Sequence, residues 1–149
     1  MSDDAEDRHF TVDEVNALLP DLQVRFDRLS ELCDEATVLA AELAALGVDL
    51  TSDEGGDPDT PEVRERRAKL AHLADRIQAD IDEVERIGGE VKDIAKGLVD
   101  FRSRHRGRTV YLCWRRGEAR VAHYHDLDTG FSGRRDLEDP DEFHGTYLH

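Results

Sequence analysis

The sequence has few residues of several kinds, and each scarcity narrows what the protein can be. Its two cysteines, Cys33 and Cys113, lie far apart in the chain, which favours free thiols in a reducing compartment over a disulfide framework. No apolar run approaches the roughly 18 residues that a membrane span needs, and the first residues have neither the basic nor the apolar region of a secretory signal. We therefore expect a cytoplasmic protein with no membrane partner.

Basic side chains are also scarce. The 149 residues contain 20 Lys and Arg against 35 Asp and Glu, which gives a net charge of −15. A protein that grips duplex nucleic acid or an anionic membrane needs a basic surface, so neither is the expected partner.

The charge is distributed unevenly along the chain. Residues 1–62 hold 18 acidic and 3 basic side chains, whereas residues 102–125 hold 7 basic and 1 acidic. The arginines of the second segment either face acidic helices of this chain or of a second copy, which we favour, or form a stacking surface for RNA. If this segment has a ligand, we expect a small anion.

The first half of the chain has the pattern of two long helices. Thr11 and Glu14 form a capping box that starts a helix, and Pro20 predicts a short helix over 12–18, a bend, and a long helix from Pro20 to Gly47. A heptad seam follows, made of Leu22, Phe26, Leu29, Cys33, Ala36, Ala40 and Leu43. An acidic loop over 47–60 leads to the second helix.

The second helix is expected to begin at Pro61 and to reach Gly88, with one or two further helical turns over Glu90–Lys96. Its apolar stripe consists of Val63, Leu70, Leu73, Ala74, Ile77, Ile81, Val84 and Ile87. We expect the two helices to pair as a long antiparallel hairpin with coiled-coil packing. Because such a hairpin has a thin core, we expect it to form a homodimer or a higher homo-oligomer.

The remaining chain has the shorter period of strands. We expect strands over Leu98–Phe101, Thr109–Trp114 and Ala119–His125, with a tight β-hairpin turn at Arg116-Gly117. In that register Val110, Leu112 and Trp114 share the core face with Ala119, Val121 and His123. The other face carries Tyr111, Cys113 and Arg115 with Glu118, Arg120, Ala122 and Tyr124.

The fold class that follows is α+β, a long antiparallel helical hairpin followed by a small antiparallel β-sheet of two to three strands. A single domain would span 9–137, with the helical hairpin over about 12–96 and the β-module over about 98–137. Residues 1–8 read as a disordered acidic tail and residues 138–149 as a flexible tail.

Two histidines are the first candidates for chemistry. His123 and His125 are two residues apart on a predicted strand and so share a face, where they can hold a divalent metal with Asp126 or Asp128 as a carboxylate ligand. Without a third fixed ligand, the pattern is also explained if His123 is a buried core histidine and His125 only makes a hydrogen bond at the end of the strand. We therefore predict no cofactor, and a bound divalent metal is the alternative.

Two further polar residues are candidates, Glu118 and Arg134. Glu118 and His125 can act as a general acid/base pair if they converge, although the expected register puts them on opposite faces. Arg134 lies in a glycine-rich loop and can bind a carboxylate or phosphate. Cys113 has no base close to it in the sequence, which argues against a thiol nucleophile.

Several short motifs together resemble a known family. They are Phe10-Thr11 with Glu14 and Asn16–Pro20, Gly88 with Val91-Lys92-Asp93, Gly97–Phe101, Tyr111–Trp114, Gly117-Glu118, His125, Asp128, Gly130-Phe131 and Gly133-Arg134. Over about 9–136 the chain resembles the uncharacterised prokaryotic family catalogued as domain of unknown function 2203. It departs from that pattern at Arg102 and Tyr124, and His123 is outside it. The family has no established activity.

The resemblance implies a polar set at the junction of helices and sheet: Lys92, Asp93, Asp100, Glu118, His125, Asp128 and Arg134. Two classes of function stay open. One is a homo-oligomeric interaction or ligand-binding module whose polar pocket uses Lys92, Asp93, Asp100 and Arg134. The alternative is a small metal-assisted or acid/base enzyme that acts on an anionic small molecule with His125, Glu118 and Asp128.

Overall fold

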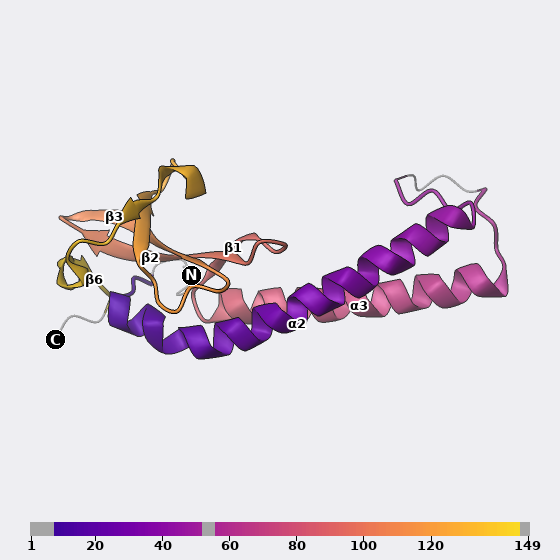
Figure 1. The fold of residues 1–149 in the computed structure, drawn as a ribbon, viewed down its shortest axis with the longest axis horizontal. Helices are drawn as coiled ribbons and strands as arrows, with labels where there is room; N and C mark the ends of the chain where they lie inside the picture. The colour runs from indigo at the N-terminus through magenta and orange to yellow at the C-terminus, as the bar shows by residue number, and fades with distance from the viewer. Residues whose placement is uncertain (1–7, 52–55, 147–149) are drawn as a thin grey trace, which may run out of the picture. The chain divides into compact units, whose positions relative to one another are not determined.

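The computed structural model describes residues 8–51 and 56–146, which contain two long helices and six strands (Figure 1). The elements are α2 (Val12–Ala45), α3 (Pro61–Arg86), β1 (Glu90–Asp93), β2 (Leu98–His105), β3 (Arg108–Arg115), β4 (His123–Asp126), η1 (Phe131–Gly133), β5 (Arg135–Asp136), η2 (Pro140–Glu142) and β6 (Phe143–His144). The α+β class is confirmed.

The chain divides into two compact units, which we describe separately. The sheet unit comprises the described residues up to Phe26 and those from Ile81 onward. The helical unit is Asp27–Asp80. Among the described residues, no helix combines the length and the apolar character needed to cross a membrane.

The helix α2 begins as predicted but continues through its proline. The Thr11 amide donates to the Glu14 carboxylate over 2.9 Å, and the Glu14 amide donates to the Thr11 hydroxyl over 3.1 Å, which confirms the capping box. The expected division into two helices is wrong, because α2 is a single helix with Pro20 inside it. Leu19 and Leu22 on either side of the proline are buried, and their packing outweighs the lost backbone hydrogen bond.

The helical unit has a core of its own. Leu43, Val48 and Val63 are buried together, with Leu70 packed against them. Asp80 is also buried, and its carboxylate accepts two hydrogen bonds from the Arg28 guanidinium, at 3.0 and 2.6 Å. A charged group taken from water needs such a partner, so this ion pair links α2 and α3 within the unit.

The sheet is larger than the sequence predicted. Its strands run in the order β1-β2-β3-β4-β5, and β6 pairs with β2, so the expected two to three strands are wrong. The pairings are antiparallel. The strands expected at Leu98–Phe101 and Thr109–Trp114 are confirmed within the longer β2 and β3.

A strand replaces the helical turns that we expected after Gly88-Gly89. Gly88 has a φ of +108°, and a Cβ atom there would lie 2.5 Å from the Phe10 ring. Only glycine fits this positive φ and close approach without strain. The chain therefore leaves the helix at this point, and Glu90–Asp93 pairs with β2 as β1.

The turn at Arg116-Gly117 is present, since the Glu118 amide donates to the Arg115 carbonyl over 3.0 Å. The strand expected from Ala119 is wrong at its start, because β4 begins at His123, which pairs with Cys113. The connecting segment is held by α2 instead. The Gln23 side chain accepts from the Gly117 amide over 3.0 Å, and the Asn16 side chain accepts from the Val121 amide over 2.8 Å. These tertiary hydrogen bonds set a longer loop than local turn preferences predict.

The segment expected to be a flexible tail contributes structure up to residue 146. Phe143 of β6 is buried, and its ring stacks on that of His105 with centroids 4.4 Å apart. The Thr146 amide donates to the His9 carbonyl over 2.8 Å. The rest of the two predicted tails, residues 1–7 and 147–149, lies outside the described residues, as do residues 52–55 of the acidic loop.

The sheet has two buried faces of different chemistry. The apolar face carries Phe101, Leu112 and Trp114. The Phe101 ring lies 5.1 Å from that of Phe10, and the Trp114 ring lies 5.9 Å from that of Phe26, between centroids. The start of α2 lies on this side, and the segment with η1 lies on the other (Figure 1).

The second face, which we call the polar face, carries residues that the sequence analysis had left outside the core. Tyr111 and Cys113 are buried there, opposite His125 and His123 of β4. The expected register placed His123 on the same face as Leu112. In the structure His123 lies on the opposite face. Antiparallel partners that face each other directly lie on the same side of a sheet. The different register therefore places every side chain of β4 on the face opposite to the predicted one.

Candidate metal centre

Three buried side chains of different chemistry meet on the polar face. Asp100 of β2, Cys113 of β3 and His125 of β4 come from adjacent strands, and Asp100 and Cys113 are direct partners in the register. Their ligand atoms all lie within 4.8 Å of one another. A cavity of about 140 Å³ opens beside them, lined by Lys92, Leu98, Asp100, Tyr111, Cys113, His125, Leu127, Gly130 and Phe131.

The hydrogen bonds of His125 define which ring nitrogen faces the site. Its Nδ1 lies 2.7 Å from the Asp126 carbonyl oxygen, and its Nε2 lies 2.9 Å from an Asp100 carboxyl oxygen. A carbonyl oxygen only accepts, so Nδ1 carries a hydrogen. The Nε2 atom is therefore the nitrogen available to share a proton with Asp100 or to coordinate a metal ion.

Burial keeps protons on this cluster. Burial raises the pKa of Asp100, although the neighbouring His125 acts in the opposite direction. Burial, with Asp100 adding to it, raises the pKa of the Cys113 thiol to about 12. At neutral pH the thiol alone is not a nucleophile. A cation that displaces its proton would convert the same atom into a strong ligand.

A charged network borders the cluster. Glu90 accepts hydrogen bonds from the Tyr111 hydroxyl at 2.8 Å, from Arg102 at 3.0 Å and from Lys92 at 3.3 Å. Burial alone would raise the pKa of Glu90, but the hydrogen bonds from Arg102 and Tyr111 hold it below its ordinary value. Burial would lower the pKa of Lys92, but Tyr111 and Glu90 raise it. Both side chains are therefore charged at neutral pH.

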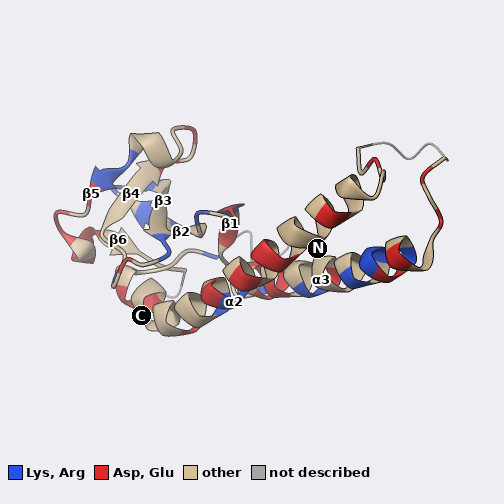
Figure 2. Cartoon of the chain, turned by 45° about the vertical axis from the view of Figure 1, so that its right-hand side comes forward, with Lys and Arg blue, Asp and Glu red and all other residues tan. Residues whose placement is uncertain are grey.

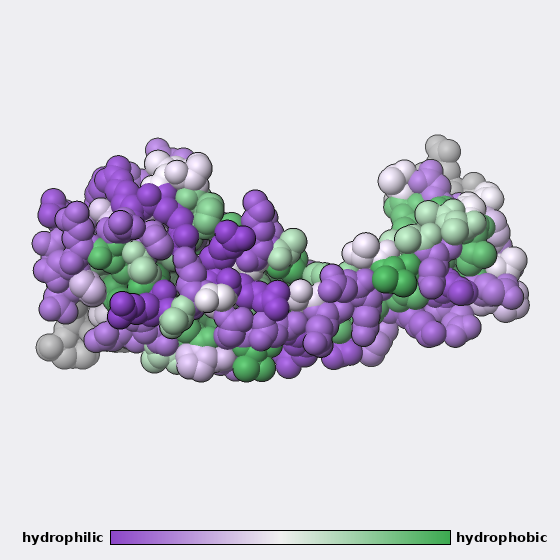
Figure 3. Space-filling view, in the orientation of Figure 1, coloured by the Kyte–Doolittle hydropathy of each residue, from purple (hydrophilic) through white to green (hydrophobic). Residues whose placement is uncertain are grey.

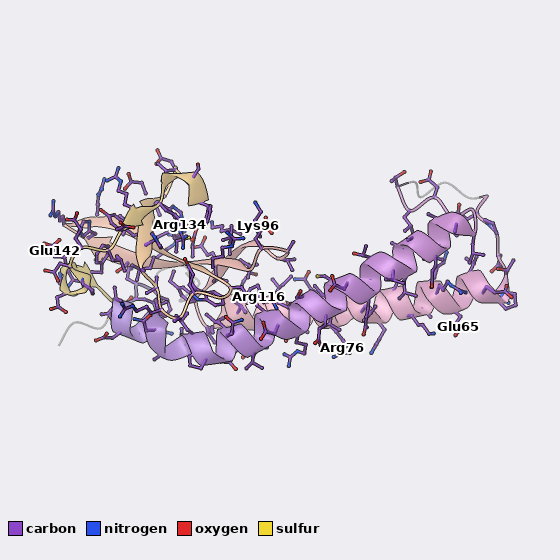
Figure 4. All side chains as sticks on the ribbon, in the orientation of Figure 1. Glu65, Arg76, Lys96, Arg116, Arg134 and Glu142 are labelled. Atoms are coloured by element: carbon purple, nitrogen blue, oxygen red, sulfur yellow. The ribbon has the colours of Figure 1, made fainter. Side chains whose placement is uncertain are left out.

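Arg134 holds the segment that covers the polar face. Its guanidinium donates to Glu118 over 2.7 Å and to the backbone carbonyl of Cys113 over 3.3 Å, and it lies 4.5 Å from the centre of the Phe131 ring (Figure 4). Glu118 also accepts from the Arg115 amide over 2.7 Å. These bonds connect β3, the loop after it and the η1 segment.

The family model described as "Uncharacterized conserved protein (DUF2203)" matches residues 8–137. The chain belongs to this family. No match is found among the curated proteins or among the solved structures. The matched residues include the cluster, its charged network and the η1 segment, whereas β6 lies beyond them.

Part of the set implied by the family pattern is brought together. Lys92, Asp100 and His125 line one cavity. It lies on the polar face, on the side of the sheet opposite the Phe10 and Phe26 rings.

The other predicted site residues do not line this cavity. Arg134 and Glu118 pair with each other, and Asp93 accepts from the Lys96 amide over 2.9 Å in the turn after β1. His123 faces Asp136 at 3.2 Å, and Asp128 is exposed. His125 is the one residue of the predicted metal set that belongs to the three-residue cluster among the described residues.

Sequence reasoning missed Cys113, Tyr111 and Glu90. The base near Cys113 comes from other strands, so a search near it along the chain could not find one. The missed clue was that the two predicted strands Leu98–Phe101 and Thr109–Trp114 could pair as a hairpin. In that hairpin Asp100 lies opposite Cys113. Tyr111 then joins Cys113 on the same face by the two-residue period of a strand.

Proposed function

We propose that the polar face binds one divalent transition metal ion of the zinc class through Asp100, Cys113 and His125. The observation that carries this proposal is the meeting of a carboxylate, a thiol and an imidazole, all buried, within 4.8 Å. Carboxylate oxygen, thiolate sulfur and imidazole nitrogen are the donors that zinc prefers. Three protein ligands leave the fourth tetrahedral position open, as in catalytic zinc sites.

The surroundings of the three residues support the same assignment. A histidine that binds a metal ion usually donates its other N–H to a carboxylate or a backbone carbonyl. The Nδ1 atom of His125 does so, with the Asp126 carbonyl 2.7 Å away. The ligands also come from paired strands rather than from loops, and strands hold side chains in defined positions.

The open position would give the ion a role in binding or chemistry. A zinc-bound water has a pKa near 7 and can act as a nucleophile, or a ligand can replace it. We propose that the protein is a small-molecule-binding module. The alternative is that the metal ion assists a reaction of the bound molecule. Both cysteines are free thiols, which supports a reducing compartment such as the cytoplasm.

The test is to measure metal content and affinity of the full chain. Protein treated with a chelator is titrated with zinc, and cobalt(II) is substituted to observe the thiolate charge-transfer absorption. We expect one ion per chain, and a loss of at least about 10-fold in affinity and of that absorption in Cys113→Ser. The matched control is Cys33→Ser, which changes a partly buried cysteine of the helical unit. No metal uptake, or equal effects of the two substitutions, would contradict the proposal.

A groove in the helical unit supports a second role, self-association. It has a volume of about 780 Å³ and is lined by Asp34, Glu35, Val38, Leu39, Ala68, Lys69, His72, Leu73 and Arg76. The Val38 side chain is 58% exposed. Hydrophobic side chains gather on the visible surface of this unit (Figure 3). Exposed apolar patches of this kind mark interaction sites.

Charge favours a second copy of the chain as the occupant of the groove. Residues 27–45 carry five acidic and one basic side chain, whereas residues 64–76 carry five basic and two acidic, as the colours of α2 and α3 show (Figure 2). A two-fold axis would place the acidic strip of each copy against the basic strip of the other. We propose that α2 and α3 form an antiparallel hairpin, and that two hairpins make a four-helix bundle.

The oligomeric state tests this second role. Light scattering over a range of concentrations should give a dimer for the wild type and a monomer for Val38→Glu, because a charge in the groove is costly to bury. The control is Val24→Glu, since Val24 is 64% exposed on α2 but outside the groove. A monomeric wild type at all concentrations would contradict dimer formation.

A further inference from the structure

We infer that the cavity beside the cluster binds a small organic carboxylate, with Lys92 as its counter-ion and the metal ion as its second contact. The inference rests on the metal site proposed above and names the ligand class of that site. Four observations carry it: the size of the cavity, the charges around it, the position of Lys92 and the apolar lining of the cavity.

The size of the cavity limits the ligand to a few heavy atoms. Its volume is about 140 Å³, which at about 30 Å³ per water molecule is room for about five molecules of that size. Drug-sized ligands need cavities of about 300 Å³ or more. A nucleotide or a sugar phosphate would extend out of this cavity into solvent.

The charged groups at the site leave a net positive charge of one. A divalent ion is neutralised by the Cys113 thiolate and the Asp100 carboxylate. In the bordering network, Lys92 and Arg102 carry two positive charges against the single negative charge of Glu90. A ligand with one negative charge would balance this net charge and so completes the site.

Lys92 is the cation that can reach such a ligand. It lines the cavity, and its ammonium lies 4.6 Å above the Tyr111 ring, which positions it. An ammonium has three N–H donors, and the contact with Glu90 at 3.3 Å uses one. Arg102 belongs to the same network but is not among the residues that line the cavity.

The remaining lining favours an organic anion over an inorganic one. Leu98, Leu127 and Phe131 give the cavity an apolar part, which a fully hydrated ion such as phosphate or sulfate would have to enter at the cost of its water. A short carboxylate such as propionate can place its oxygens between Lys92 and the metal ion and its carbon chain against these side chains.

The experiment uses the full chain loaded with cobalt(II), whose visible spectrum reports a change of ligand. Metal content is measured first, and propionate, phosphate and sulfate are then titrated. Propionate should change the spectrum with saturation, and the two inorganic anions should bind at least about 10-fold more weakly. Phosphate or sulfate binding as tight as propionate would overturn the carboxylate assignment.

Two lysine variants separate the inference from the proposed function. Lys92→Met keeps the aliphatic stem but removes the charge, and should retain one metal ion per chain while weakening propionate binding about 10-fold or more. Lys96→Met is the control, because Lys96 lies in the turn after β1 (Figure 4) and is not among the residues that line the cavity. Failure of the wild type to take up metal would overturn the metal site. Normal uptake with equal propionate affinity in wild type and Lys92→Met would overturn the role of Lys92 alone.

Discussion

The two faces of the sheet are both buried, but they are buried for different reasons. On the apolar face, Trp114 and Phe101 lie against aromatic rings that precede or belong to α2, and removal of hydrocarbon from water stabilises the fold. On the polar face, Asp100 and His125 are nearly as inaccessible, yet burial of such groups costs free energy. Burial on the apolar face therefore stabilises the fold. Burial on the polar face costs free energy, and this cost is our reason for assigning a function to that face.

The largest expected effect is on the apolar face. Trp114→Ala should lower the free energy of unfolding by about 3–5 kcal/mol, because the side chain is fully buried and its loss leaves a cavity. Leu127→Ala, at a residue that is 49% exposed on the polar side, should change it by about 0.5 kcal/mol or less. Urea denaturation followed by circular dichroism compares the two. Similar losses would remove the distinction between the faces.

The next effect belongs to the polar face and depends on metal. Zinc at about 100 times its dissociation constant should stabilise the wild type by about 2.7 kcal/mol, because it binds the folded state. His125→Ala removes one of the three proposed ligands, and its stability should not respond to zinc. Thermal unfolding with and without zinc gives both values. A variant that zinc stabilises as much as it does the wild type would exclude His125 as a ligand.

A smaller effect follows from the pKa of Cys113 in the metal-free protein. Folding raises this pKa from 9.0 to about 12, so the folded state favours the neutral thiol. The stability that this contributes is complete below pH 9 and is lost as the pH rises from 9 toward 12. The urea midpoint of the wild type should fall from about pH 8 to about pH 10.5 by more than that of Cys113→Ala. An equal fall in both proteins would contradict this account.

The smallest effect distinguishes two aspartates. Asp100 is buried in the cluster, whereas Asp128 is exposed. Asp128→Asn should leave zinc affinity unchanged and the free energy of unfolding within about 0.5 kcal/mol of the wild-type value, while Asp100→Asn should weaken zinc binding. Titration calorimetry on both variants provides the comparison. A loss of zinc affinity in Asp128→Asn would instead support Asp128 as a metal ligand, which the sequence analysis named as a candidate.

The strand segments near the site were predictable where local pattern was strong. The β-branched and aromatic residues of Thr109–Trp114 indicated a strand, and Asp100 and Lys92 entered the candidate set through the family pattern. The partner of His125 was not predictable, because the expected register set the end of β3 against the wrong residues. The true register depends on bonds that Asn16 and Gln23 make from α2.

Residues of weak local signal could not be placed from sequence. Glu90–Asp93 resembles a helical turn in composition, and it became β1 because Gly88 packs against Phe10. Phe143 was predicted to lie in a tail. It forms part of β6 instead, because its ring stacks on that of His105. In both segments a contact between residues distant in the chain decided the structure, as is usual for strands, whose preferences depend on their neighbours.

The sequence by itself determined the two helices, the start of α2 and the separation of charge between the first half and the later arginines, because these depend on periodicity and on residues within one or two turns. Only the tertiary structure decided which strands pair and in which register. That register brings Asp100, Cys113 and His125 together. The physical reason is that strand pairing is made of contacts between distant segments, which no local pattern specifies.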